Sequence, residues 1–225
     1  MTSGLFPPGA VIRRVNAEPV ILLGGGRAVL MQLAHPSVAA GVAEHSGFAA
    51  DPFRRLRQTL VAMNTIVYGT EEDARTTASA LAAVHHRVRG ATYAADDPEL
   101  LLWVHATLVD TALRVHRRFL GELAADVAET YYLESTAVAE LLGVPLDRQP
   151  PDLAAFRTYV RATVGELAVS DTARRLAAEV LHPRLPLVTG PLVELARQVT
   201  VGLLPPPLRS QFGFPWGWAQ ETALA

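Results

Sequence analysis

The sequence contains no cysteine and no lysine, although arginine supplies 20 basic residues. Without cysteine there are no disulfides, no thiolate ligation of iron and no zinc sites built on cysteine. Without lysine there is no side chain for Schiff-base chemistry. Any metal ligand must therefore be His, Asp, Glu, Tyr or Met, which makes the seven histidines the most informative polar residues.

Long apolar runs and a strong charge of either sign are also missing. No stretch reaches the ~20 apolar residues that span a bilayer, and no basic segment precedes an apolar run at the start. We therefore expect a cytoplasmic protein without a transmembrane segment. The formal net charge of -2 provides no basic field, so a nucleic-acid partner is not expected.

Hydrophobic residues make up 50% of the chain and charged residues only 19%. This apolar content is above the average for a globular domain, so either the core is large or a cofactor, partner or membrane covers apolar surface. The pattern shows no two-residue alternation, no repeat and no linker between halves. These features predict one all-α domain covering residues 1–225.

Capping and stop signals divide the chain into helices. Asp51 and Asp97 each precede a proline, which is typical of a helix start, and Thr70 to Asp73 resembles a capping box. The run from Val20 to Leu33 is apolar and carries three glycines, so helix and strand are both open there. The predicted helices are about 52–68, 71–89, 98–120, 125–142, 152–167, 171–181 and 191–204.

Two histidines lie on the apolar stripes of consecutive predicted helices. His85 follows Ala78 and Leu81 at helical spacing, and His105 lies between Leu101 and Leu108. Both are expected to point inward, toward one pocket. A buried neutral imidazole needs partners for both nitrogens, which a haem iron and a second acceptor would supply. The alternative is that each ring hydrogen-bonds a carbonyl or carboxylate in the core.

Three further groups are candidates for binding or catalysis. Arg55 and Thr59 lie one turn apart, so together they could hold a carboxylate; an ordinary exposed pair is the alternative. The Gly24–Arg27 segment lacks the spacing of a phosphate loop and suggests close approach of the backbone to a flat ligand, with Arg27 as a cofactor-binding residue. Glu44 is a candidate catalytic carboxylate in a predicted loop after Gly41.

Four strings in order, with their spacing, resemble the MpaB and rubber oxygenase family. They are LLGGGRAVLMQLAHPSVAAGVAEHSGF, DPFRRLRQT, VHHRVRG and LLWVHATLVDTAL, and the likeness runs from about Leu22 to Leu142. The resemblance implies a helical fold with globin-like features around one haem b, whose iron is held by His85 or, with a shifted register, His86. Gln58 stands where rubber oxygenases have lysine, so rubber cleavage itself is not implied.

The family resemblance assigns roles to the candidate residues. His85 is the expected iron ligand and cofactor-binding residue, joined by Arg55, His105 and Arg27. Arg55, Thr59 and Glu44 are the expected catalytic residues. The function hypothesis is a haem-dependent oxygenase that acts with O2 on a small apolar alkene, isoprenoid or lipid-like molecule.

Two other hypotheses remain open at this point. One is a non-catalytic haem or gas-binding protein, because a haem pocket does not by itself define turnover. The other is a haem-free helical module that binds lipid or a partner through the apolar 186–208 region. That same apolar segment also admits a homodimer.

Overall fold

The helices occupy most of the chain in the computed structural model, which describes residues 4–45, 52–182 and 190–224. Within these ranges, the side chains of residues 52–56, 190–192, 223 and 224 lie outside the description. In chain order the elements are α1 (Val11–Asn16), the 3-10 helix η1 (Pro19–Gly24), α2 (Gly25–Ala34), α3 (Pro36–His45), α4 (Pro52–Tyr68), α5 (Glu71–Arg87), α6 (Pro98–Phe119), α7 (Ala125–Leu141), the 3-10 helix η2 (Leu146–Arg148), α8 (Leu153–Glu166), α9 (Asp171–Leu181), α10 (Gly190–Leu203), α11 (Pro206–Gln211) and α12 (Trp218–Leu224).

No β-strand occurs in the described ranges, where Arg89 and Ala94 form an isolated bridge. The all-α prediction is therefore confirmed. Local chemistry explains the helix ends. Thr70 and Asp73 form the expected capping box at the start of α5. Gly121, with φ of +100°, follows α6 in a left-handed conformation that glycine adopts without strain.

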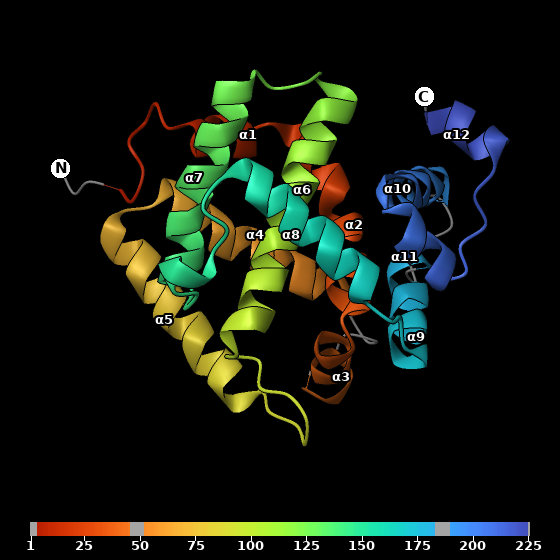
Figure 1. Cartoon of the computed structure of the whole chain (residues 1–225), viewed down its shortest axis with the longest axis horizontal. Coiled ribbons are helices and arrows are strands. Elements are labelled where there is room, and N and C mark those ends of the chain that lie inside the picture. Colours follow the sequence, from red (N-terminus) through yellow and green to blue (C-terminus); the bar gives the residue numbers. More distant parts are fainter. Residues whose placement is uncertain (1–3, 46–51, 183–189, 225) are drawn as a thin grey trace.

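Helices α2 and α6 form the centre of the molecule (Figure 1). They pack against each other; α2 also contacts α3, α9 and α10, and α6 also contacts η1, α7 and α8. The 22-residue α6 begins where the Asp97 carboxylate accepts a hydrogen bond from the backbone N–H of Glu99 at 2.9 Å. Helix α2 ends at Ala34, and the backbone of His35 is extended, because the following Pro36 disfavours helical backbone in the residue before it.

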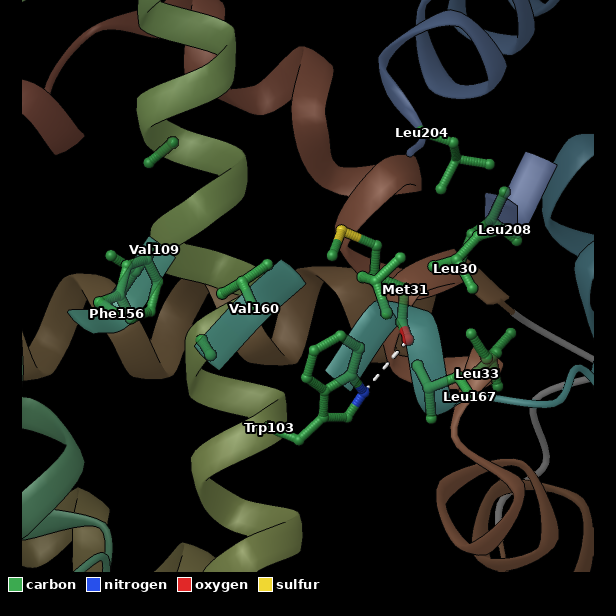
Figure 2. Close-up of a cluster of buried hydrophobic side chains, with 14 of the residues drawn as sticks. Leu30, Met31, Leu33, Trp103, Val109, Phe156, Val160, Leu167, Leu204 and Leu208 are labelled. Carbon is green, nitrogen blue, oxygen red and sulfur yellow. Dashed lines mark hydrogen bonds between the residues drawn. The ribbon is translucent and has the colours of Figure 1, made fainter. Parts of the chain in front are cut away.

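The main core lies where α2 and α6 meet α8 and the C-terminal helices (Figure 2). Trp103 is fully buried, and its indole N–H donates a hydrogen bond to the backbone carbonyl of Met31 at 3.2 Å. Leu30, Leu204 and Leu208 are also buried in this cluster. Each such leucine stabilises the fold by about 2 kcal/mol relative to an exposed side chain.

The apolar C-terminal segment contributes largely to this interior. Val199, Leu203, Leu204 and Leu208 are buried within the chain, whereas Leu195 is exposed. Much of the apolar surface that suggested a homodimer is thus covered by the chain itself. The homodimer stays a prediction.

The structure differs from the sequence-based expectations in its first and last parts. The Val20–Leu33 run is helical, with the change from η1 to α2 falling within its three glycines. The loop expected after Gly41 is wrong, because α3 continues through Glu44 to His45. Gly41 lies inside this helix beside the Tyr93 ring, so a glycine that resembled a stop instead allows close packing. The short helices α1, α11 and α12 were not expected.

No helix in the described part of the chain is both long enough and apolar enough to cross a membrane.

Candidate functional site

Two adjoining cavities lie inside the helical bundle. The larger, of about 680 Å³, is bounded by residues of α1, η1, α2, α4, α6 and α7. The smaller, of about 390 Å³, is bounded mainly by α3, α4, α5, α6 and the segment after α5. Five residues line both cavities: Gln32, Thr59, Met63, His105 and Leu108. The two spaces therefore share a wall made by α2, α4 and α6.

Both cavities are mostly apolar. Among the described residues that line them, Glu18 of the larger cavity is the one acidic side chain, and neither lining contains arginine. Several polar groups of the larger cavity already have partners. The Tyr131 hydroxyl donates to Asn16 Oδ1 at 3.1 Å, and Gln32 Nε2 donates to the Thr107 hydroxyl at 3.1 Å. The interior thus offers little to a charged occupant.

His105 differs from these satisfied groups. Its side chain is buried on α6 in the shared wall, and neither Nδ1 nor Nε2 has a hydrogen-bond partner. Burial lowers the pKa of His105 to about 4, and the interaction of the ring with the Ser135 backbone opposes this shift without reversing it. The ring is therefore neutral near pH 7, with one nitrogen able to donate and the other able to accept.

His85 and His86 are neighbours in α5, but their side chains face in different directions. His85 of α5 is partly buried and lines the smaller cavity. The His86 side chain is 73% exposed and its Nδ1 lies 3.0 Å from Asp96 Oδ2. The inward direction predicted for His85 and His105 is confirmed, and both lie in the wall of one cavity. Between the two register alternatives, the geometry favours His85 for any ligand inside the protein.

Thr59 and its neighbours occupy the α4 side of the site. Thr59 lines both cavities, and Gln58 lines the smaller one. The backbone of Arg55 lies one turn earlier in α4, but its side chain lies outside the described residues. The roles predicted for Arg55 and Thr59 stay predictions.

Glu44 and His45 lie at the C-terminal end of α3, at the edge of the smaller cavity. The Glu44 carboxylate is half-exposed and accepts a hydrogen bond from the Tyr93 hydroxyl at 2.7 Å. Burial and the Glu44 carboxylate raise the pKa of Tyr93 to about 12, so its hydroxyl remains a donor. His45 lines the cavity, and its Nε2 lies 3.1 Å from the carbonyl oxygen of Arg89. The predicted catalytic role of Glu44 remains a prediction.

Arg27 is fully buried but lies outside the lining of both cavities. Its guanidinium donates to the Leu203 carbonyl at 2.7 Å, to the Thr111 hydroxyl at 2.6 Å and to Asp110 Oδ2 at 2.6 Å. Burial lowers the pKa of Arg27, and the Asp110 carboxylate opposes that shift. This network joins α2, α6 and the end of α10. A cofactor-binding role for Arg27 stays a prediction.

No group of three or more histidine and acidic side chains in the described ranges lies close enough together to hold a metal ion. His45, His85 and His105 all line the smaller cavity, but at separate positions on three helices.

The sequence did not reveal the larger cavity or the contribution of Tyr93. The larger cavity is assembled from six elements between residues 12 and 138, and no local pattern marks such a space. The packing of Tyr93 explains two glycines, because an added Cβ on Gly41 or on Gly90 would approach the Tyr93 ring. The sequence shows these glycines, but their contact with Tyr93 is visible only in the folded structure.

The fold and the cavities define an all-helical domain built around two adjoining, mostly apolar cavities. Residues 12–225 match the family model described as "ER-bound oxygenase mpaB/B'/Rubber oxygenase, catalytic domain". The chain therefore belongs to this oxygenase family, as the sequence resemblance predicted.

Two mycobacterial proteins are similar to the chain over most of its length. They are the uncharacterized proteins Rv2237 of Mycobacterium tuberculosis and Mb2261 of Mycobacterium bovis. Each is 32% identical over 207 residues, which cover 86% of this chain and 80% of the relative. No solved structure matches the chain.

Proposed function

We propose that the protein is a haem b-dependent oxygenase that acts with O2 on a small apolar molecule. The observation that carries this proposal is the smaller cavity, which presents His85 and His105 from two helices within a mostly apolar lining. Membership of an oxygenase family supports the reaction class. In this proposal the haem lies in the smaller cavity, with His85 as the iron ligand.

The residues present fit such a cofactor. His85, the residue assigned to the iron, is partly buried and faces the smaller cavity from α5. The described residues of this lining include no acidic side chain and no arginine, as suits the apolar faces of a porphyrin. When bound, haem supplies an iron centre that binds and activates O2.

The chain's own residues then set the conditions for the reaction. Leu81, Val84 and Val88 line the cavity and give His85 an apolar surrounding. Thr59 lies in the shared wall, where its hydroxyl can orient the cofactor or the substrate. Arg55, one turn away, is proposed to assist it by pairing with a carboxylate. Glu44 is proposed to accept a proton at the edge of the site, where the Tyr93 O–H already donates to it.

The test is the absorption spectrum of protein produced with a haem precursor. Wild type is expected to show a Soret band that His85→Ala loses and that added imidazole restores. His86→Ala is the matched control, because the neighbouring ring is exposed and lies outside the cavity lining; it should keep the band. A colourless wild type after haem titration, or a band lost in His86→Ala alone, contradicts the assignment.

Turnover is tested separately, because binding of haem does not define a reaction. Consumption of O2 by the haem-loaded protein with an apolar alkene, and formation of an oxygenated product, are the expected results. A normal Soret band without O2 consumption over a panel of alkenes would instead indicate a haem or gas-binding protein.

A further inference from the structure

We propose that the larger cavity binds an elongated apolar molecule with one uncharged hydroxyl or carbonyl group, which hydrogen-bonds to His105. This inference rests on the proposed function, because it assigns the substrate class and the place where the substrate lies. The large cavity would hold the apolar chain, and the polar group would lie at the wall shared with the smaller cavity.

The unpartnered imidazole is the first reason. Buried polar side chains are nearly always hydrogen-bonded, and an unmade bond at such a site costs free energy. His105 is buried with both ring nitrogens unpartnered, whereas Gln32 in the same shared wall already donates to Thr107. An occupant with one donor or acceptor would satisfy a nitrogen of His105 and place its own polar group there.

The charges of the lining determine which polar group fits. Burial keeps the His105 ring neutral, and the described residues that line the larger cavity include no arginine. Glu18 is the acidic residue among them, and it would repel a carboxylate. An anionic head beside His105 would therefore be buried against a neutral ring, which is costly, while a hydroxyl or carbonyl needs only a hydrogen bond. The cavity thus favours an alcohol, aldehyde or ketone over a fatty acid.

The place of the ligand's polar group follows from the position of His105. His105 is buried in the wall shared with the smaller cavity, whereas Leu22 of η1, which lines the larger cavity alone, is 59% exposed. In this proposal the polar group lies at the buried shared wall, and the carbons beside it lie nearest the proposed cofactor.

Equilibrium dialysis of the haem-loaded full-length chain against 1-dodecanol, dodecanoate and 1-dodecene tests this inference. We expect 1-dodecanol to bind at least about 10-fold more tightly than dodecanoate. His105→Phe should weaken 1-dodecanol binding by about 10-fold, the value of one hydrogen bond, and leave 1-dodecene unchanged. His116→Phe is the matched control on the same helix, because His116 lies outside both linings. It should change neither affinity.

A second variant tests whether the ligand occupies the larger cavity without changing His105. Ala28 is buried, lines the larger cavity and is absent from the smaller one, so Ala28→Phe should fill the space and abolish binding of all three probes while the Soret band remains. Circular dichroism verifies that each variant is folded. Tight dodecanoate binding, unchanged 1-dodecanol binding in His105→Phe, or unchanged binding in a folded Ala28→Phe protein overturns the inference.

The same samples separate this inference from the proposed function. A Soret band that changes in ligand-free His105→Phe would place His105 on the cofactor and overturn the ligand assignment while leaving the oxygenase proposal intact. Haem-free wild type that still binds 1-dodecanol in preference to dodecanoate would support the ligand site even if the haem proposal failed.

Discussion

Arg27 and His105 are both basic, both buried and both located near the contact of α2 with α6, yet their surroundings differ. Arg27 donates to a carbonyl, a hydroxyl and a carboxylate, and its own side chain lines neither cavity. His105 has no partner for either nitrogen and lies in the wall of both cavities. The first arrangement stabilises the fold, whereas the second leaves binding capacity unused. For a buried polar side chain, the presence or absence of hydrogen-bond partners separates a structural role from a binding role better than burial does.

The largest predicted effect is the loss of stability when Arg27 is replaced. Arg27→Met should lower the free energy of unfolding by about 4 kcal/mol, because Asp110, Thr111 and the Leu203 carbonyl all lose a buried donor. Urea denaturation measures the change. Arg75→Met is the control: its ion pair with Glu71 is exposed, so its loss should cost under about 1 kcal/mol. An Arg27→Met protein as stable as the control would contradict the structural role.

The second prediction concerns pH and His105 in the haem-free protein. The pKa of His105 in the folded state is about 4, below its ordinary value of 6.5. Between these pH values the unfolded chain binds this proton more readily, so folding stability falls as the pH falls from about 6.5 to 4. The loss from this residue should be about 3 kcal/mol. Urea titrations at several pH values should show it in wild type and not in His105→Phe; parallel curves for the two proteins would refute it.

A third prediction compares packing beside Arg27 with packing in the larger cavity. A Cβ on Gly26 would lie 2.3 Å from the Thr200 hydroxyl oxygen, so Gly26→Ala should cost about 2 kcal/mol despite its better helix propensity. Ala112→Val adds atoms on the cavity side of α6 and should cost under about 1 kcal/mol. Thermal unfolding ranks the two variants. Partial recovery in Gly26→Ala with Thr200→Ala would assign the cost to that contact.

The smallest expected effect is that of His105→Phe on stability at neutral pH. Replacing an unpartnered polar ring with an apolar ring of similar shape should change the free energy of unfolding by less than about 1 kcal/mol. Urea denaturation at pH 7 measures it. A loss comparable with that of Arg27→Met would show that His105 has a structural partner, and the comparison between the two residues would collapse.

Local signals in the sequence were sufficient for much of the fold. The Thr70 capping box, the Asp97 cap and Gly121 act over a few residues, and each marks a helix end in the structure. Helical spacing alone also placed His105 on an inward stripe. The prediction of a loop at Glu44 was wrong, because Gly41 allows close packing against Tyr93, which lies far along the chain, and does not end the helix.

Long-range arrangements could not be read in this way. The Arg27 network joins residues 83, 84 and 176 positions apart, so the sequence does not show that this arginine is already satisfied. The cavities have the same origin, since their walls come from many helices. Sequence spacing identified the inward histidines, but only the packed structure shows which of them has no partner.

The shared wall also has a thermodynamic consequence. An occupant of one cavity that repositions Thr59, Met63 or Leu108 necessarily reshapes the other cavity, because these side chains face both. Binding free energies around a closed cycle must sum to zero, so coupling between two occupants is reciprocal. Whatever factor the proposed cofactor adds to the affinity for the proposed apolar ligand, the ligand adds to the affinity for the cofactor. In that case the protein would hold its cofactor more tightly when the ligand is abundant.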